Sequence, residues 1–283
     1  MAVGLVDAGG GLHVDRQAPT PARGDGESMF IALVQLIDVV RGLGEAAGLP
    51  APIVCGVGCG GPMTRRGETV TPINIPAWRA FPLRSLLREA IGLPVHVDND
   101  AKALALGEGW VGAAVGCSNF VAMVVSTGVG GGVVLDGRLL DGAAGNAGHI
   151  GHMIVDPDGH ECGCGARGCV EAEASGSAIE RITGKPASEA TPEVIDRAGM
   201  MVGRAIASVA NLLDLQLAVV AGSVALGFGD PFFVAAQLEI DARARLDFSK
   251  GTVIRPAALG ANGPLIGAAA VGFRAEGHDL GIA

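Results

Sequence analysis

The segment His149-Ile-Gly-His-Met-Ile-Val-Asp-Pro-Asp-Gly-His-Glu-Cys-Gly-Cys-Gly-Ala-Arg-Gly-Cys-Val-Glu171 constrains this chain more than any other part of its sequence. Three of the six cysteines, Cys162, Cys164 and Cys169, lie within eight residues and are separated by glycines, so the backbone can fold back and direct all three sulfurs to one point. His152 precedes the first of them by ten residues. Three thiolates and one imidazole predict a closed tetrahedral zinc site, which is structural because no coordination position remains for a substrate.

Two other interpretations of the clustered thiols are open. A disulfide is disfavoured because three thiols are an odd number, because Cys162 and Cys164 are too close for easy bridging, and because the N-terminus shows no signal peptide. Free or redox-active thiols are the second alternative. The other cysteines, Cys55, Cys59 and Cys117, are isolated in apolar surroundings and are expected to be small buried packing residues.

The two ends of this segment carry polar groups that a zinc site alone does not need. His149 and Glu171 are each able to point into a neighbouring cleft and form hydrogen bonds with a polyhydroxylated ligand. In the alternative interpretation, Glu171 opens a helix through Ala174 and His149 is a surface residue. The residues alone do not separate these interpretations.

Composition limits the class of protein. At 283 residues the chain can bury a substantial core, as one large domain or as two lobes. Hydrophobic residues make up 49%, yet no run approaches the ~20 apolar residues of a membrane helix. The formal charge of −9, with 20 scattered Lys and Arg residues, argues against a nucleic-acid partner. We therefore expect a soluble, cytoplasmic enzyme that binds neither membranes nor nucleic acids.

Strand patterns and helix patterns alternate along the chain, which predicts an α/β fold with a substantial parallel sheet. A hairpin is predicted over residues 2–14. Further strands are predicted at 53–57, 94–97, 120–126, 133–135 and 217–221. The predicted helices span 29–47, 81–90, 101–110, 176–182, 192–213 and 264–273.

A glycine-rich turn lies between two of the predicted strands, with the sequence Ser126-Thr-Gly-Val-Gly-Gly-Gly132. Successive backbone N–H groups in such a turn can point inward and bind a phosphate, and the Ser and Thr hydroxyls favour this interpretation. The turn lacks the Gly-Lys-Ser/Thr ending of a Walker loop. A glycine-rich hairpin turn without function is the alternative.

Asp100 is the candidate general base. It follows a predicted strand and precedes a predicted helix, where a carboxylate can accept the proton of a substrate hydroxyl during phosphoryl transfer. The alternative is a helix cap, because Asp98, Asn99 and Asp100 are all residues of the preferred capping types. Composition and spacing leave both interpretations open.

Taken together, these motifs resemble successive signatures of the ROK (repressor, ORF, kinase) sugar kinases. They are Asn99-Asp100-Ala101, the turn at 126–132, Gly148-His-Ile-Gly-His152 and Cys162-Gly-Cys-Gly-Ala-Arg-Gly-Cys-Val-Glu171. The resemblance implies the two-lobed, actin-like ATPase fold of hexokinases and Hsp70, with a cleft between the lobes. The expected lobes are residues 1–116, completed by a C-terminal helix within 264–283, and residues 117–263, which contain the zinc segment 149–171.

The resemblance also implies roles for individual residues. Asp100 is then the general base of an ATP- and Mg²⁺-dependent kinase, and a homodimer is expected. His152 is expected both to ligate zinc and to contact the sugar. The other expected sugar-binding residues are Asn74, Asn99, His149 and Glu171. ATP is expected at Ser126, Thr127, Gly128, Gly130 and Gly131 through its phosphates, and near Gly222 and Ser223 through its adenosine.

The chain departs from the family pattern at His149, where most glucokinases and fructokinases of the family have Glu. A His followed by Ile-Gly-His and then Cys-Gly-Cys-Gly is similar to the N-acetylmannosamine kinases of bacteria. An imidazole in place of a carboxylate changes which sugar substituents the site accepts. The expected reaction is phosphorylation of the 6-hydroxyl of a hexose or N-acetylhexosamine, with N-acetylmannosamine and glucose as the first candidates.

The second departure concerns an Asp-x-Gly-Gly-Thr phosphate loop, with which members of the family begin. This chain lacks that motif before the hairpin at 2–14. Absence of the loop and its strand is expected to leave backbone groups of neighbouring strands without partners. We expect either a start codon upstream or a weak, truncated catalyst. The alternative is a non-catalytic, zinc-containing sugar-binding or regulatory protein; a DNA-binding repressor is disfavoured because no DNA-binding module is recognisable.

Overall fold

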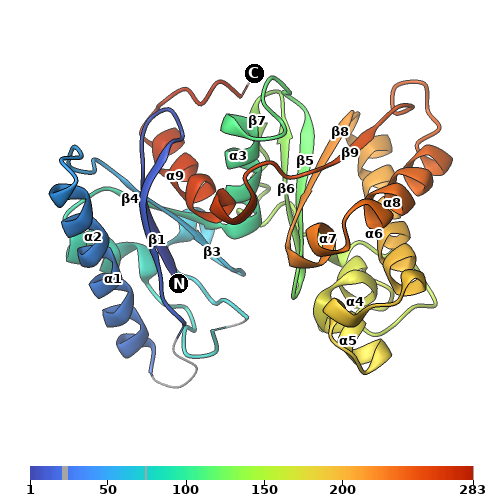
Figure 1. The fold of residues 1–283 in the computed structure, drawn as a ribbon, viewed down its shortest axis with the longest axis horizontal. Coiled ribbons are helices and arrows are strands. Elements are labelled where there is room, and N and C mark those ends of the chain that lie inside the picture. Colours follow the sequence, from blue (N-terminus) through green and yellow to red (C-terminus); the bar gives the residue numbers. More distant parts are fainter. Residues whose placement is uncertain (21–24, 74, 283) are drawn as a thin grey trace.

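The computed structural model describes residues 1–20, 25–73 and 75–282 (Figure 1). A five-stranded mixed sheet with the order β7-β6-β5-β8-β9 forms one part of the molecule. β5 pairs parallel with β8, and β8 with β9, whereas β6 and β7 run antiparallel to their neighbours. The sheet is therefore parallel on one side of β5 only. Its strands are β5 Phe120–Val125, β6 Val129–Leu135, β7 Arg138–Leu139, β8 Leu217–Ala221 and β9 Val253–Pro256.

Helices cover both faces of this sheet because successive side chains of β5 point to opposite faces. Phe120 and Ala122 pack with α3 (Asp100–Val111) and α9 (Gly263–Ala275). Val121 and Met123 pack with α6 (Pro192–Leu213) and α8 (Asp230–Arg243) on the other face. The short helices of that second face are α4 Val170–Ala174, α5 Gly176–Thr183 and α7 Ser223–Phe228.

Glycines allow the close helix packing on that face. A Cβ atom added to Gly199 or Gly203 of α6 would lie 2.5 Å from a backbone oxygen of α8. The two glycines are four residues apart and therefore share one face of α6. The backbones of α6 and α8 are therefore in close contact along this face.

The other part of the molecule contains two two-stranded sheets. β1 (Ala2–Val6) pairs antiparallel with β2 (Leu12–Gln17), and β3 (Cys55–Cys59) pairs parallel with β4 (Val95–Asn99). α3 and α9 lie between these strands and the five-stranded sheet (Figure 1). Its outer helices are α1 Gly26–Ala46 and α2 Leu83–Ile91, and the short 3₁₀ helices of the molecule are Arg65–Gly67, Ile150–His152, Ala187–Glu189 and Gly260–Asn262.

Residues of β1 and β3 line one apolar groove of about 500 Å³. Within the described residues β1 pairs only with β2, and β3 only with β4. Ile37 and Val40 of α1 line the groove, and so do Leu265 and Ala268 of α9. The groove is therefore bounded by two strands and by helices of the same part of the molecule.

One predicted turn is shorter than the sequence indicates. The glycine-rich turn was expected to run from Ser126 to Gly132, but β6 begins at Val129, so Gly130 and Gly131 are strand residues. The physical reason is close packing: a Cβ atom on Gly132 would lie 2.9 Å from the Lys102 Cα atom of α3. No described helix combines the length and hydrophobicity needed to cross a bilayer.

Candidate functional site

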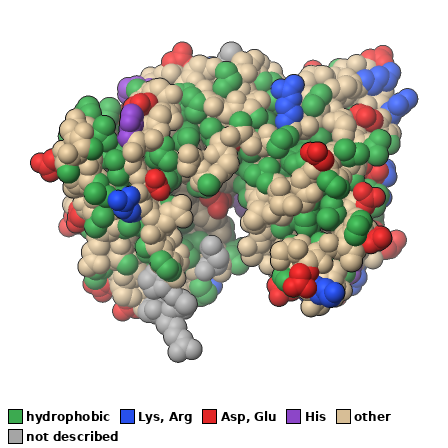
Figure 2. Space-filling view, viewed as in Figure 1, with side chains coloured by type: hydrophobic (Ala, Val, Ile, Leu, Met, Phe, Trp, Pro, Cys, Tyr) green, Lys and Arg blue, Asp and Glu red, His purple; other side chains and the backbone are tan. Residues whose placement is uncertain are grey.

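A cleft of about 890 Å³ brings most of the predicted site residues together. The N-terminal end of α3, the β5–β6 turn and the segment from Gly148 to Gly163 contribute to its walls. Figure 2 shows a hollow between the two parts of the molecule, with acidic and histidine side chains visible inside it. The predicted residues that line the cleft are Asn99, Asp100, Ser126, Thr127, Gly128, Gly130, Gly131, His149, His152, Cys162 and Glu171.

Asn99 and Asp100 share the start of α3 but have different environments. Asn99 is the N-cap, because its Oδ1 accepts hydrogen bonds from the amides of Ala101 (3.0 Å) and Lys102 (3.4 Å). Its Nδ2 group is left to donate to a ligand. Asp100 is the first helical residue, and its Oδ1 also accepts from the Ala101 amide at 2.8 Å. Capping therefore falls to Asn99, and Asp100 is not needed as the cap.

The surroundings of Asp100 favour its neutral form. The side chain keeps a face open to the cleft, yet the protein around it removes much of its water, and this desolvation raises the pKa of the carboxyl group. A hydrogen bond from the Ala101 amide and the nearby His149 act in the opposite direction. The result is a carboxylate that is a stronger base than an ordinary exposed aspartate.

Glu171 joins the metal-binding segment to the β5–β6 turn. Its Oε2 accepts a hydrogen bond from the Val129 amide at 3.0 Å. A Cβ atom on Gly128 would lie 2.9 Å from the same oxygen, so a glycine is needed there for this approach. Glu171 is the second residue of α4, which agrees with the helical alternative, and it faces the cleft as well.

The β5–β6 turn offers fewer free backbone amides for an anion than the predicted seven-residue turn would. The Ser126 amide bonds to the Gly128 carbonyl, and the Val129 amide to Glu171. Within the described chain, the amides of Thr127 and Gly128 are the two in the turn that make no hydrogen bond. The carbonyls of Ser126 and Thr127 accept from Gly176 and Ser177 at the start of α5. An anion at this turn can therefore meet two backbone donors.

His149 and His152 both reach the cleft, with ring centroids 6.2 Å apart. His149 is exposed, and His152 is half-buried. The Nδ1 atom of His152 lies 3.6 Å from Cys162 Sγ, which leaves its Nε2 atom available to another partner. One imidazole can thus contact both the thiol cluster and the cleft.

The geometry of the thiol cluster fits a tetrahedral metal ion. The ligand atoms of His152, Cys162, Cys164 and Cys169 all lie within 4.8 Å of one another. Two sulfurs that each lie ~2.3 Å from zinc are about 3.8 Å apart at the tetrahedral angle. The Cys164 and Cys169 sulfurs are 3.8 Å apart, which matches this value. All six cysteines lie in the described part of the chain, and none is in a disulfide.

The thiols differ in acidity. Burial raises the pKa of the Cys169 thiol to about 12, and the neighbouring Cys162 and Cys164 add to this shift. In contrast, a hydrogen bond from the Ala166 amide lowers the pKa of the exposed Cys164. Because a metal binds the thiolate, it would displace the proton of Cys169 on entering.

Four predicted residues that the structure describes do not line the cleft: Gly222 and Ser223 of the nucleotide set, and the metal ligands Cys164 and Cys169. Gly222 and Ser223 lie at the start of α7, where Gly222 has a φ of 105° and a Cβ atom would lie 2.2 Å from the Val125 carbonyl oxygen. Ser223 Oγ is 2.9 Å from Ser126 Oγ, so this pair still lies beside the turn. Asn74 lies outside the described residues.

Sequence reasoning missed several residues near the cleft. Lys102 is almost fully buried and forms ion pairs with Asp98 (3.0 Å) and Asp141 (2.8 Å). The pair was not indicated by the sequence, because Asp98 precedes the helix predicted from residue 101 and lies in β4. Arg181 of α5 also lines the cleft and donates to the Ala172 carbonyl at 3.1 Å. No sequence signal indicated that contact, because it depends on how α4 and α5 pack.

Comparison with known proteins gives a family match over most of the chain. A family model described as the ROK family matches residues 1–274. The chain is 35% identical over 246 residues to an N-acetylmannosamine kinase of Escherichia fergusonii, covering 81% of each chain. Among solved structures, a ROK hexokinase from Thermus thermophilus is 33% identical, with a TM-score of 0.80 and coverage of 98% and 99%. A ROK glucokinase from Streptomyces griseus, in complex with glucose and AMPPNP, is 27% identical, with a TM-score of 0.80 and coverage of 96% and 95%.

Proposed function

Because this chain belongs to the ROK family and has its two-lobed, actin-like ATPase fold, we propose that it is an ATP-dependent sugar kinase. The observation that carries the proposal is the position of Asp100, a carboxylate of raised pKa in the same cleft as Glu171 and the β5–β6 turn. The acceptor is the 6-hydroxyl of a hexose or N-acetylhexosamine. N-acetylmannosamine and glucose are the candidates, since both kinds of kinase occur among the similar proteins.

Asp100 acts as the general base in this proposal. It accepts the proton of the sugar hydroxyl as that oxygen attacks the terminal phosphoryl group of Mg²⁺-bound ATP. The raised pKa supports this role, because a stronger base takes the proton more readily. The hydrogen bond from the Ala101 amide orients the carboxylate. Lobe closure then excludes water before transfer.

The sugar is held by groups on opposite walls of the cleft. Asn99 donates through Nδ2, since its Oδ1 is occupied by the helix cap. Glu171 accepts sugar hydroxyls through the oxygen that Val129 leaves free. His149 and the Nε2 atom of His152 complete the set. The imidazole of His149 favours an N-acetylated sugar over one whose hydroxyls are all unsubstituted. Asn74 is included on the family resemblance.

ATP lies along the β5–β6 turn in this proposal. The amides of Thr127 and Gly128 and the Ser126 hydroxyl meet phosphate oxygens. Gly130 and Gly131 line the same cleft as strand residues, and their lack of side chains lets β6 pack against Ala101 and Ile150 beside the turn. Gly222 and Ser223 lie next to the turn on the side where the adenosine is placed.

The Cys₃His cluster holds a structural zinc ion in this proposal, with His152, Cys162, Cys164 and Cys169 as ligands. Zinc there stabilises the segment that ends at Glu171. The two lobes that move are residues 1–116 with the C-terminal helix, and residues 117–263. On the family resemblance we extend the proposal to a cytoplasmic homodimer, and sedimentation of the purified protein tests the dimer.

One observation favours a second candidate, a sugar-binding or regulatory protein without turnover. Within the described residues, β1 and β3 each pair on one side only, beside the groove between them. This is the arrangement expected when the strand that carries the family's first phosphate loop is absent from between them. The two candidates separate in one experiment: ADP release with Mg²⁺-ATP and each of N-acetylmannosamine, glucose, mannose and fructose, run beside calorimetric sugar binding. Sugar-dependent ADP release supports the kinase. Sugar binding without ADP release supports the second candidate.

A further inference from the structure

Glu173 is a buried carboxylate that the proposed reaction does not use. Its side chain is 0% exposed. Oε1 accepts a hydrogen bond from the His160 amide at 2.5 Å, and Oε2 lies 2.9 Å from His160 Nδ1. Oε2 also accepts from Arg197 Nη2 at 2.7 Å. These contacts lower the pKa of the carboxyl group even though burial acts to raise it. A buried charge is costly unless it is paired and hydrogen-bonded, and three groups of the surrounding protein do this for Glu173.

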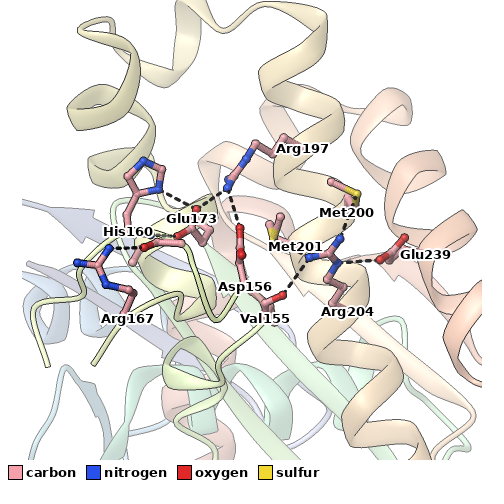
Figure 3. Close-up of polar contacts among 12 residues, drawn as sticks. Val155, Asp156, His160, Arg167, Glu173, Arg197, Met200, Met201, Arg204 and Glu239 are labelled. Carbon is pink, nitrogen blue, oxygen red and sulfur yellow. Dashed lines mark hydrogen bonds and ion pairs between the residues drawn. The ribbon is translucent and has the colours of Figure 1, made fainter. Parts of the chain in front are cut away.

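The contacts of Glu173 connect the metal-binding loop, residues 155–169, to α6 (Figure 3). Arg197, which also lies 3.4 Å from Asp156 Oδ2, is in the first half of α6. One further arginine, Arg204, lies two turns later and donates to the Val155 carbonyl at 3.0 Å. Figure 3 shows both arginines extending from α6 toward the start of the loop. α6 therefore holds this loop directly at Val155 and Asp156, and at His160 through Glu173.

The point held by Glu173 is next to the metal ligands. His160 lies two residues before Cys162, and its carbonyl accepts the Gly168 amide at 2.8 Å, next to Cys169. A Cβ atom on Gly159 would lie 2.3 Å from Glu173 Oε1, so the loop backbone packs directly on the carboxylate. Glu173 thus fixes the backbone just before the cysteine cluster, and the His160–Gly168 hydrogen bond joins that point to the residue before Cys169.

The same short helix carries the sugar-site carboxylate. Glu171 and Glu173 are two residues apart on α4, so they point in different directions. Glu171 bonds to Val129 at the cleft, and Glu173 bonds to the loop and to α6. A shift of α4 toward or away from α6 therefore moves Glu171 as well.

We propose that Glu173 is a positioning residue, which together with Arg197 holds the loop so that the Cys₃His ligands are arranged before the metal binds, and which fixes α4 with Glu171. This inference rests on the zinc site of the proposed function. It predicts that zinc affinity depends on a side chain that does not itself bind zinc. Residues that orient metal ligands typically change metal affinity about 10- to 100-fold when replaced.

The test measures the Zn²⁺ dissociation constant by competition with a chromophoric chelator, on the full chain stripped of metal under reducing conditions. Glu173→Gln and Arg197→Gln are each expected to weaken zinc binding about 10- to 100-fold. Arg197→Lys is expected to recover most of the affinity, because Arg197 contacts Glu173 through a single nitrogen atom. Sugar KM is expected to rise in the two glutamine variants with kcat little changed, since Asp100 is untouched.

The matched control is Glu108→Gln. Glu108 is also a fully buried carboxylate with three hydrogen-bond donors, the amides of Ala113 (2.7 Å), Ala258 (3.1 Å) and Leu259 (3.1 Å), but it lies on α3 and these partners are outside the loop. The zinc affinity of this control variant is expected to stay within about twofold of that of the wild-type protein, because the replaced side chain does not contact the loop. Equal loss in the control and in Glu173→Gln would overturn the proposal, because the effect would then be general destabilisation. Unchanged zinc affinity in Arg197→Gln would also overturn it, and this variant serves where Glu173→Gln fails to fold.

Failure of the proposed kinase activity is distinguishable from failure of this inference. Zinc affinity is read without turnover, so a protein that releases no ADP can still show the predicted differences between variants. If the wild-type chain binds zinc no more tightly than Cys164→Ser does, the proposed zinc site is refuted, and so is this inference.

Discussion

The Glu171 carboxylate accepts a hydrogen bond from the Val129 amide at 3.0 Å, which joins the last residue of the metal-binding segment to the β5–β6 turn. These residues are 42 positions apart in the sequence. One oxygen of the carboxylate is thereby fixed, and the other is the one that we propose binds a sugar hydroxyl. The zinc cluster, the sugar pocket and the phosphate turn are therefore mechanically connected in the proposed enzyme.

Replacement of Asp100 tests its role as general base. Asp100→Asn keeps the size of the side chain but cannot take the proton, so kcat is expected to fall about 10²- to 10⁴-fold. Sugar affinity, measured by calorimetry, is expected to stay within a few-fold. Turnover at the wild-type rate would show that Asp100 is not the base.

The same variant has a pH-dependent effect on stability. The folded-state pKa of Asp100 is raised, so between its unfolded and folded values the native protein binds more protons than the unfolded chain. Stability therefore falls as pH rises through this window. Asp100→Asn removes that penalty, so it is expected to be at least as stable as the wild-type protein at neutral pH. Urea unfolding at pH 4 and pH 7 checks this: the advantage of the variant should shrink at pH 4, and an advantage that grows there would contradict the assignment.

Gly128 is predicted to be required for sugar binding. Gly128→Ala places a methyl group 2.9 Å from Glu171 Oε2, which displaces the carboxylate. We expect kcat/KM for the sugar to fall about 10-fold or more, a loss of ~1.4 kcal/mol in transition-state binding. Gly42→Ala in α1, where no atom lies within 4 Å of the added methyl, is the matched control and should retain full activity. Equal activity of the two variants would argue against the Glu171 contact.

Loss of one thiol tests the metal site. Cys164→Ser is expected to lose zinc and to lower the unfolding midpoint by about 4 °C or more, since metal-binding energy at a structural site is also folding energy. Cys117→Ser is the control, because Cys117 lies outside the cluster and a serine can still donate to the Asn119 carbonyl. Metal content by atomic absorption gives a second readout, and a Cys164→Ser protein with full zinc content would refute the ligand set.

The sequence predicted regular elements best where the apolar pattern is long or the flanking residues are distinctive. α6 and β8 begin and end at the predicted residues, and the hairpin of β1 and β2 is present. α8 and β9 were missed. α8 presents a narrow buried stripe of Phe232, Ala236 and Ile240 on an otherwise mixed helix, and β9 has only four residues, of which Ile254 alone is buried. Neither pattern is distinctive without its packing partners.

The candidate site was predictable where its residues are close in sequence. The thiols and His152 belong to one short segment, and they lie together. Contacts between distant segments, such as Glu173 with Arg197, follow from the packing of α4 on α6 and have no local signature. The glycines of β6 show the same limit: a turn and a strand packed closely under a helix both require Gly, so the sequence could not distinguish Gly130 and Gly131 in the strand from turn residues.

Sugar-dependent ADP release is the most direct measurement of the central claim. The purified chain and its Asp100→Asn variant are each incubated with Mg²⁺-ATP and either N-acetylmannosamine or glucose, and ADP is followed with a coupled assay. We predict sugar-dependent ADP release by the wild-type chain and its near-complete loss in the variant. Sugar binding by the wild-type chain without ADP release for any hexose or N-acetylhexosamine would contradict the kinase assignment.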